Sequence, residues 1–158
     1  MIEIVESRYT ASGHRKCIVN LLNDYAEGIR SGAGLPDGVK TRLVDELEKR
    51  NNIHTVLAFV DGKAAGVAIS IESFSTFMCM PILNIHDVVV SKEFRGRGIS
   101  KMMLGKVEKI ALRLGCCKLT LEVLEHNEVA KNLYRSLGFA PYELDPKMGM
   151  AQFWEKKL

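Results

Sequence analysis

The most constraining feature of this sequence is a strand, a glycine-containing loop and a helix that follow one another between residues 88 and 114. The valine run at residues 88–90 predicts a buried strand. Gly96 and Gly98 then interrupt the chain just before an amphipathic helix, which is predicted from Gly98 to Leu114. Gly115 stands where a glycine commonly ends a helix. The unit favours a fold in which helices pack against a sheet.

The loop between this strand and this helix has the chemistry of an anion site. Glycines let a backbone approach a ligand closely, and a helix start offers unpaired N–H groups and the positive end of the helix dipole. Arg95 and Arg97 add two forked cationic groups. The alternative is a flexible turn with two solvated arginines, and the loop alone does not separate the two interpretations. Lys101 occupies the third glycine position of a dinucleotide-binding loop, and the Gly-Lys-Ser/Thr of a P-loop is missing.

The rest of the chain predicts further helices and strands around this unit. Helical spacing of apolar residues indicates helices over 11–29 and 37–49, and Asn127 is placed as the N-cap of a helix that ends at Gly138. Strands are predicted at 2–5, 55–60, 64–71, 83–90, 118–123, 139–144 and 151–156, with a tight turn at Asp61-Gly62. We therefore expect one α/β (α+β mixed) domain over residues 1–158, in the order β-α-α-β-β-β-α-β-α-β-β. Its mixed sheet would have about seven strands, with helices on both faces.

The composition limits the classes of partner and compartment. The 158 residues include 22 Lys+Arg and 19 Asp+Glu, and this net charge of +3 does not favour nucleic acid as a partner. No apolar run approaches about 20 residues, so no segment is expected to span a membrane. The start of the chain does not resemble a signal peptide, and the four cysteines show neither zinc spacing nor a disulfide pattern. A cytoplasmic protein with reduced thiols and no metal site is expected.

A second motif makes the interpretation of the loop more specific. The loop has the form Arg-x-x-Gly-x-Ser over residues 95–100, and residues 127–139 have the form Asn-x-x-Ala-x-x-Leu-Tyr-x-x-x-Gly-Phe. In this order, with a predicted helix and strand between them, the two segments resemble the two signatures of the GNAT family of N-acetyltransferases. The resemblance is strong over residues 84–139. Ser100 departs from the Gly or Ala that is usual in the family, but serine is small enough to preserve a close approach.

The resemblance implies an acyl-CoA N-acyltransferase fold, with acetyl-CoA as the acyl-donor substrate and no metal. Backbone amides of the loop and the helix start would hold the coenzyme A pyrophosphate, supported by the side chain of Arg95. The backbone of Val88 and Val90 would pair with the pantetheine arm as an added strand, in a gap where the two central strands separate. The candidate binding residues of this segment are Val88, Val89, Val90, Arg95, Gly96, Arg97, Gly98, Ile99 and Ser100.

Asn127 and Tyr134 each have a structural and a functional interpretation. Asn127 is an N-cap by position, and the resemblance adds a hydrogen bond to the pantetheine arm. Tyr134 lies on the apolar stripe of its helix, which is typical of a core residue. The resemblance makes it the acid that protonates the departing thiolate, because a phenol with a pKa of about 10 can donate to a thiolate whose conjugate acid has a pKa of about 8.5.

An amine acceptor must lose a proton before its nitrogen attacks the thioester. His86 and Asp87 lie on the strand before the loop and are the candidate bases, although successive strand residues face opposite ways. A histidine suits proton transfer near neutral pH, but a lone strand histidine is also often structural. A water relay with no single base is a further alternative. The backbone N–H near Val88 is the expected donor to the oxyanion.

The expected function is acetyl transfer from acetyl-CoA to a primary amine of a small molecule or a peptide. The alternative is a CoA-binding sensor or regulatory module with the same fold and little catalysis. The acceptor is not identified by the sequence. Dimers are common in the family, so a homodimer is one state open to the chain. No nucleic acid and no membrane are expected as partners.

Overall fold

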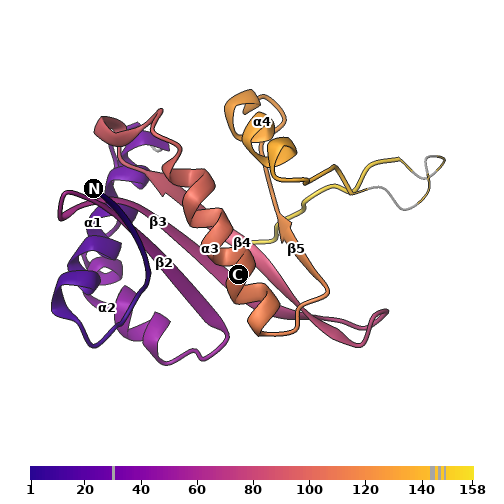
Figure 1. Cartoon of the computed structure of the whole chain (residues 1–158), viewed down its shortest axis with the longest axis horizontal. Helices are drawn as coiled ribbons and strands as arrows, with labels where there is room; N and C mark the ends of the chain where they lie inside the picture. Colours follow the sequence, from indigo (N-terminus) through magenta and orange to yellow (C-terminus); the bar gives the residue numbers. More distant parts are fainter. Residues whose placement is uncertain (30, 143–144, 146, 148) are drawn as a thin grey trace. The chain divides into compact units, whose positions relative to one another are not determined.

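A five-stranded mixed sheet organises the computed structural model, which describes residues 1–29, 31–142, 145, 147 and 149–158. The strands are β1 (Ile2–Glu6), β2 (Ile53–Val60), β3 (Lys63–Ser75), β4 (Met80–Val90) and β5 (Lys118–Leu121), and they lie side by side in this order. The first four pair antiparallel with their neighbours, and β5 pairs parallel with β4 (Figure 1). Residues 1–122 and 123–158 form two compact units, and each is described by itself.

The helices follow the predicted ones closely. They are α1 (Ser12–Ile29), α2 (Asp37–Glu48), α3 (Ile99–Arg113) and α4 (Glu128–Ser136), with a short 3-10 helix, η1 (Lys92–Phe94), ahead of the glycine loop. Helix α3 connects the two parallel strands β4 and β5, as a parallel pair requires. Gly115 ends α3 with a φ of 71°, and the β2–β3 turn has positive φ at both Asp61 (49°) and Gly62 (79°). These local predictions are confirmed.

Helices cover both faces of the sheet in residues 1–122. On one face, α1 and α2 pack against apolar side chains of β2, β3 and β4 in a buried cluster formed by Ile18, Leu21, Leu22, Val44, Leu47, Leu57, Val67, Ile69 and Val89. On the other face, α3 lies against Gly66, where an added Cβ would come within 2.9 Å of the Met103 methyl carbon. Gly66 and Val67 are consecutive, so they point to opposite faces. The helices on both faces and the mixed sheet agree with the prediction, whereas the predicted number of about seven strands is wrong.

The two strands predicted for the tail are wrong in the residues that the structure describes. Residues 151–156 form no strand, and neither do residues 139–142; positions 143 and 144 lie outside the described residues. The sheet therefore has five strands rather than about seven. Strand propensity expresses how well side chains fit a pleated, half-buried surface, and residues 151–158 are all exposed. Whether residues 1–158 act as one domain stays a prediction.

Candidate functional site

Strand β4 loses one of its two neighbours halfway along its length. The ladder between β4 and β5 runs from Ile82, opposite Lys118, to Ile85, opposite Leu121. Within it, the Asn84 side chain donates a 3.0 Å hydrogen bond to the Thr120 hydroxyl. Beyond Ile85, β4 continues to Val90 paired with β3, and no other strand of the described residues pairs with it there. This is the place where the resemblance implies that the two central strands separate.

The backbone groups of Val88 and Val90 face the open edge of β4. Ser91 donates its N–H to the carbonyl oxygen of Ala65 on the β3 side, at 2.9 Å. Backbone groups alternate in direction along an antiparallel strand, so Val89 also faces β3, whereas Val88 and Val90 face away from it. The side chain of Val89 is buried in the core. The open edge therefore offers two peptide groups in the spacing of a normal strand.

The loop after β4 is held in a conformation that only glycine adopts easily. Gly96 and Gly98 have φ of 76° and 73°, in the left-handed region. Gly98 is the N-cap of α3, and no side chain caps this helix start. The first turn of α3 contains no acidic residue. Ile99 anchors the turn through a side chain that is 2% exposed, while Arg95, Gly96, Arg97 and Gly98 are exposed. The first N–H groups of α3 are thus presented beside exposed cationic side chains.

The two arginines of the loop are positioned differently. The Nε of Arg95 donates a 3.2 Å hydrogen bond to the carbonyl oxygen of Val90, at the open edge of β4. The guanidinium of Arg97 lies over the ring of buried Phe94, with its Cζ atom 5.5 Å from the ring centroid. Arg95 therefore links the glycine loop to the strand edge, and Arg97 is held on η1. Ser100 is half-buried in the first turn of α3.

The two candidate bases lie at a β-bulge. The register between β3 and β4 passes from Ile69 opposite Asp87 to Ser70 opposite Ile85, so His86 is an extra residue. His86 is exposed, whereas Asp87 is half-buried beside Ile69, which belongs to the core under α1 and α2. Burial raises the pKa of the Asp87 carboxyl, and the charge of His86 opposes this shift. The sequence predicts that side chains alternate between the two faces along this strand. It does not predict the bulge, because no residue pattern at 86–87 indicates one.

The second unit carries Asn127 and Tyr134 on one short helix. The side-chain oxygen of Asn127 accepts a 3.2 Å hydrogen bond from the Ala130 N–H, so the predicted N-cap is confirmed. Tyr134 is half-buried, and its ring meets that of Phe139 edge to face, with centroids 5.9 Å apart. No residue of α4 is fully buried. The Leu-Tyr and Gly-Phe parts of the second motif are therefore brought together through this ring contact.

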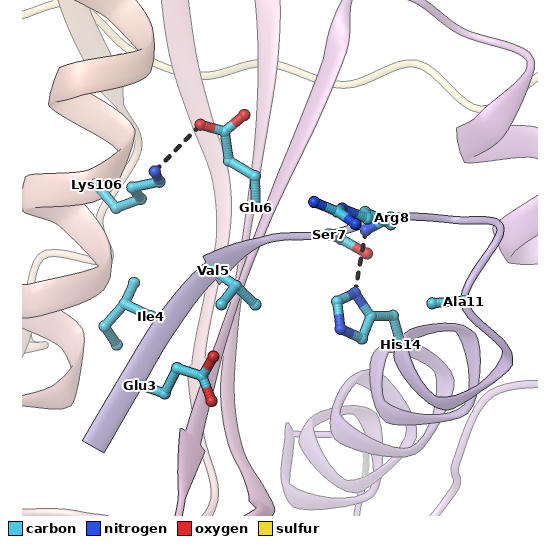
Figure 2. Close-up of a pocket in the computed structure, with 9 residues that line it drawn as sticks. All are labelled: Glu3, Ile4, Val5, Glu6, Ser7, Arg8, Ala11, His14 and Lys106. Carbon is cyan, nitrogen blue, oxygen red and sulfur yellow. Dashed lines mark hydrogen bonds and ion pairs between the residues drawn. The ribbon is translucent and has the colours of Figure 1, made fainter. Parts of the chain in front are cut away.

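A pocket also lies along β1, at the opposite edge of the sheet from β5 (Figure 2). It is lined by Glu3, Ile4, Val5, Glu6, Ser7, Arg8, Ala11, His14 and Lys106. Glu6 pairs with Arg113 at 2.9 Å and with Lys106 at 3.3 Å, and hydrogen bonding to Arg113 lowers the pKa of this carboxyl. The Arg8 N–H donates to the Nδ1 atom of His14 at 3.0 Å. Glu6 and the Arg8 N–H thus have partners, whereas the Ser7 hydroxyl is buried without a hydrogen-bond partner among the described residues. Strands β2 and β3 separate β1 from β4.

Within the described ranges, no helix is both long enough and apolar enough to cross a membrane. Among the same residues, no three His, Cys, Asp or Glu side chains are grouped so that they could hold a metal ion.

Comparison with known proteins gives the family. The model of the "Acetyltransferase (GNAT) family" matches residues 18–139, which include the open edge of β4, the glycine loop and α4. The match covers most of the chain, and the protein belongs to the GNAT acetyltransferase family.

Curated relatives share part of the sequence. A thialysine N-epsilon-acetyltransferase from Bos taurus is 41% identical over 66 residues, which are 42% of this chain and 38% of that protein. An aminoglycoside N(6')-acetyltransferase type 1 from Salmonella typhimurium is 25% identical over 125 residues, which are 76% of this chain and 86% of that protein. The chain spans less than half the length of the thialysine acetyltransferases that it matches.

Solved structures share the fold. An AAC(6')-Iy enzyme, in complex with a bisubstrate analogue of CoA and acetylneamine, has a TM-score of 0.78 at 19% identity, covering 100% of this chain and 99% of that one. A possible acetyltransferase from Clostridium difficile has a TM-score of 0.78 at 23% identity, covering 100% and 98%. These likenesses establish the fold.

Proposed function

We propose that this protein is an N-acetyltransferase that moves an acetyl group from acetyl-CoA directly to a primary amine of a small molecule or a peptide. The observation that carries the proposal is the open edge of β4, which leads into the uncapped start of α3. The strand edge offers peptide groups for an extended amide chain, and the helix start offers N–H groups for a pyrophosphate. Acetyl-CoA has both parts in this order. The thialysine and aminoglycoside acetyltransferases to which the chain is similar are named for acetyl transfer to an amine nitrogen.

The binding roles are divided between backbone and side chain. Val88 and Val90 pair with the pantetheine arm through their outward peptide groups, while Val89 holds β4 to β3. The amides of Gly96, Gly98, Ile99 and Ser100 bind the pyrophosphate. Arg95 and Arg97 add positive charge beside it. Asn127 caps α4 and contributes a further polar contact to the pantetheine arm.

The chemical step is a direct transfer. The acceptor amine loses a proton to His86, to Asp87 or to a water held by them, and the neutral nitrogen attacks the thioester carbon. The oxyanion that forms accepts a hydrogen bond from the outward N–H of Val88. When the carbon–sulfur bond breaks, the thiolate of CoA takes a proton from the Tyr134 phenol. The acylated nitrogen then releases its extra proton, which restores the phenol directly or through water. The products are the amide and free CoA.

The half-buried position of Asp87 bears on the choice of base. Its raised pKa brings the carboxyl closer to the range in which a base exchanges protons at working pH. The exposed His86 carries an imidazole, which is a side chain suited to proton transfer near neutral pH. Asp87 and His86 lie one and two residues before Val88 on β4, at the bulge.

Thermal unfolding with added ligand tests the proposal first. Saturation with acetyl-CoA at about 100 times its Kd should stabilise the protein by roughly 2.7 kcal/mol. For this size, Tm should rise by roughly 5–10 °C. NAD and ATP serve as controls, because they carry phosphates but no pantetheine arm. A rise with acetyl-CoA alone, followed by thiol release with a panel of amines, supports acetyl transfer. An equal rise in Tm with ATP would mean that the site binds phosphates in general. No rise with acetyl-CoA would refute the proposed acetyl-CoA site.

A sensor that binds CoA without catalysis is the alternative from another class. A sensor needs no acid at the position of Tyr134, and the thialysine and aminoglycoside relatives are acetyltransferases. Release of thiol in the presence of an amine acceptor, and its loss in Tyr134→Phe, separate the two functions. Stabilisation by acetyl-CoA with no transfer to any amine class would favour the sensor.

A further inference from the structure

Strand β4 changes its pairing with both of its neighbours at almost the same place. The ladder with β5 ends at Ile85, opposite Leu121, and the ladder with β3 has its bulge at the next residue, His86. Figure 1 shows β5 running away from β4 beyond their short ladder. A bulge bends its strand and increases the local twist, so it favours the separation of β4 from β5 at this point. The place where the two strands separate therefore coincides with the bulge.

Asn84 is an unexpected residue in this part of β4. Its neighbours are the apolar Ile82, Leu83 and Ile85, and asparagine is depleted in strands. The half-buried Asn84 side chain donates from Nδ2 to the Oγ1 atom of Thr120, at 3.0 Å. Thr120 is also its direct partner in the parallel ladder, so the two side chains lie on the same face of the sheet. The bond offsets the cost of taking a polar amide out of water at this position.

The same bond specifies the register between β4 and β5. A slip of one residue in either direction would place a leucine, Leu119 or Leu121, opposite Asn84 and would break the bond. The other end of the ladder is held by the backbone, because Cys117 donates its N–H to the carbonyl oxygen of Pro81 at 2.9 Å. The ladder between these two contacts has only four residue pairs. The side-chain bond thus holds the end of the ladder from which the strands separate.

We infer that Asn84 and Thr120 are positioning residues, which fix the point where β4 and β5 separate and thereby the place of the reacting groups on β4. The inference rests on the acetyl transfer proposed above, in which His86 or Asp87 serves the acceptor amine and the Val88 N–H serves the oxyanion. All three groups follow Asn84 within one short stretch of β4. The first of them, His86, is two residues away, which is about 7 Å along an extended strand.

Loss of the bond should lower turnover and leave acetyl-CoA affinity nearly unchanged. The proposed pyrophosphate loop lies beyond the other end of the open edge, where Gly96 and Gly98 set its conformation and Arg95 ties it to Val90. Without the bond, the last pairs of the β4–β5 ladder open more often, and the residues that follow lose a lateral restraint. A displacement of about 1 Å at reacting groups can cost about 100-fold in rate. The pair acts through the backbone of β4 and takes no part in the chemistry.

Two substitutions of Thr120 test the pair by steady-state kinetics and calorimetry. Thr120→Val keeps the branched shape and removes the hydroxyl, whereas Thr120→Ser keeps the hydroxyl. Thr55→Val is the matched control, because Thr55 shares a 2.8 Å hydrogen bond with the Tyr9 hydroxyl on β2, which β3 separates from β4. We expect Thr120→Val to lower kcat roughly tenfold and to leave the Kd for acetyl-CoA within about twofold of wild type. Thr120→Ser and Thr55→Val should retain the wild-type kcat.

Hydrogen exchange of the ligand-free protein tests the pair without any reaction. Relative to the amide protons of β2, those of β5 should exchange several-fold faster in Thr120→Val than in wild type or Thr120→Ser. Unchanged exchange of β5 in Thr120→Val would overturn the inference. So would a kcat equal to that of Thr55→Val, or a fall in kcat matched by an equal loss of acetyl-CoA affinity. If wild type releases no thiol with any amine, the proposed function is refuted, and hydrogen exchange still decides whether the pair fixes the strand separation.

Discussion

Arg95 donates a hydrogen bond from its Nε atom to the carbonyl oxygen of Val90, at 3.2 Å. The Val90 carbonyl faces the open edge of β4, so the arginine side chain lies where the loop and the strand edge meet. A carbonyl oxygen has two lone pairs and can accept a second donor while this bond persists. Arg95 therefore joins the two halves of the proposed acetyl-CoA site, the strand edge and the pyrophosphate loop.

Replacing Arg95 with alanine is expected to weaken acetyl-CoA binding roughly tenfold, which corresponds to about 1.4 kcal/mol. The variant removes a cation beside the pyrophosphate and also the bond that positions the loop on β4. Isothermal titration calorimetry measures the Kd. Arg97→Ala removes the same charge from a side chain that contacts Phe94 and not β4, and should cost less. Equal losses in the two variants would mean that only charge matters at this loop.

Gly98→Ala is expected to lower the free energy of unfolding by about 1–2 kcal/mol, because an L-residue is strained in the left-handed region. Gly98 has a φ of 73°, and an added Cβ would meet no atom within 4 Å, so backbone strain is the whole effect. Gly105→Ala is the control inside α3, where an added Cβ also meets nothing. This change should stabilise the protein by roughly 0.5–1 kcal/mol. Urea unfolding measures both, and shifts of the same sign would contradict the argument.

Tyr134→Phe is expected to reduce kcat by roughly 100-fold or more, which is the usual contribution of a general acid. The ring remains, so the edge-to-face contact with Phe139 should be retained and the Kd for acetyl-CoA should be unchanged. Steady-state kinetics and calorimetry separate the two quantities. A parallel loss of kcat and affinity would make Tyr134 a packing residue of α4 instead of the acid.

Asp87→Asn is expected to change how stability depends on pH. Burial raises the pKa of Asp87, so this carboxyl supports folding when it is protonated and loses that support as pH rises through its folded-state pKa. As pH rises from the ordinary carboxyl range towards neutrality, the free energy of unfolding of Asp87→Asn should therefore increase relative to that of wild type. Urea unfolding at a series of pH values measures the difference.

His86→Gln is the companion of that variant. The charge of His86 lowers the pKa of Asp87, so its removal should extend the same loss of stability to higher pH. A difference between Asp87→Asn and wild type that is independent of pH would mean that Asp87 is not perturbed in the folded protein.

Local features of the fold could be predicted from the sequence because they depend on a few neighbouring residues. Asp61-Gly62 specifies a turn with two positive φ angles, and Gly98 and Gly115 specify the ends of α3. Asn127 specifies the start of α4 through its own side chain. The left-handed conformation of the glycine loop has the same local origin, whereas its role as an anion site stays a prediction.

Pairing between distant segments could not be predicted in the same way. The bulge at His86 depends on the register with β3, and residues 86 and 87 show no local sign of it. The β3–β4 hairpin is also longer than predicted. Local residue patterns predict strands at 64–71 and 83–90, whereas the ladder between the two strands continues to Ser75 opposite Met80. For the tail, the prediction was wrong in the opposite direction, because strands were expected where the described residues form none. Its residues have strand propensity, but residues 151–158 remain exposed and unpaired in a ladder.

The early end of the β4–β5 ladder has a consequence for the time scale on which single amide protons exchange with water. The N–H of Val89 is directed into the β3 ladder and should exchange only when the sheet opens, whereas the N–H of Val88 faces the open edge and should exchange far sooner. A ligand that lies along this edge completes the missing ladder and should slow the proton of Val88 while leaving that of Val89 unchanged. The ratio of the amide exchange rates of Val88 and Val89 therefore reports whether the strand edge is occupied, without any reaction taking place.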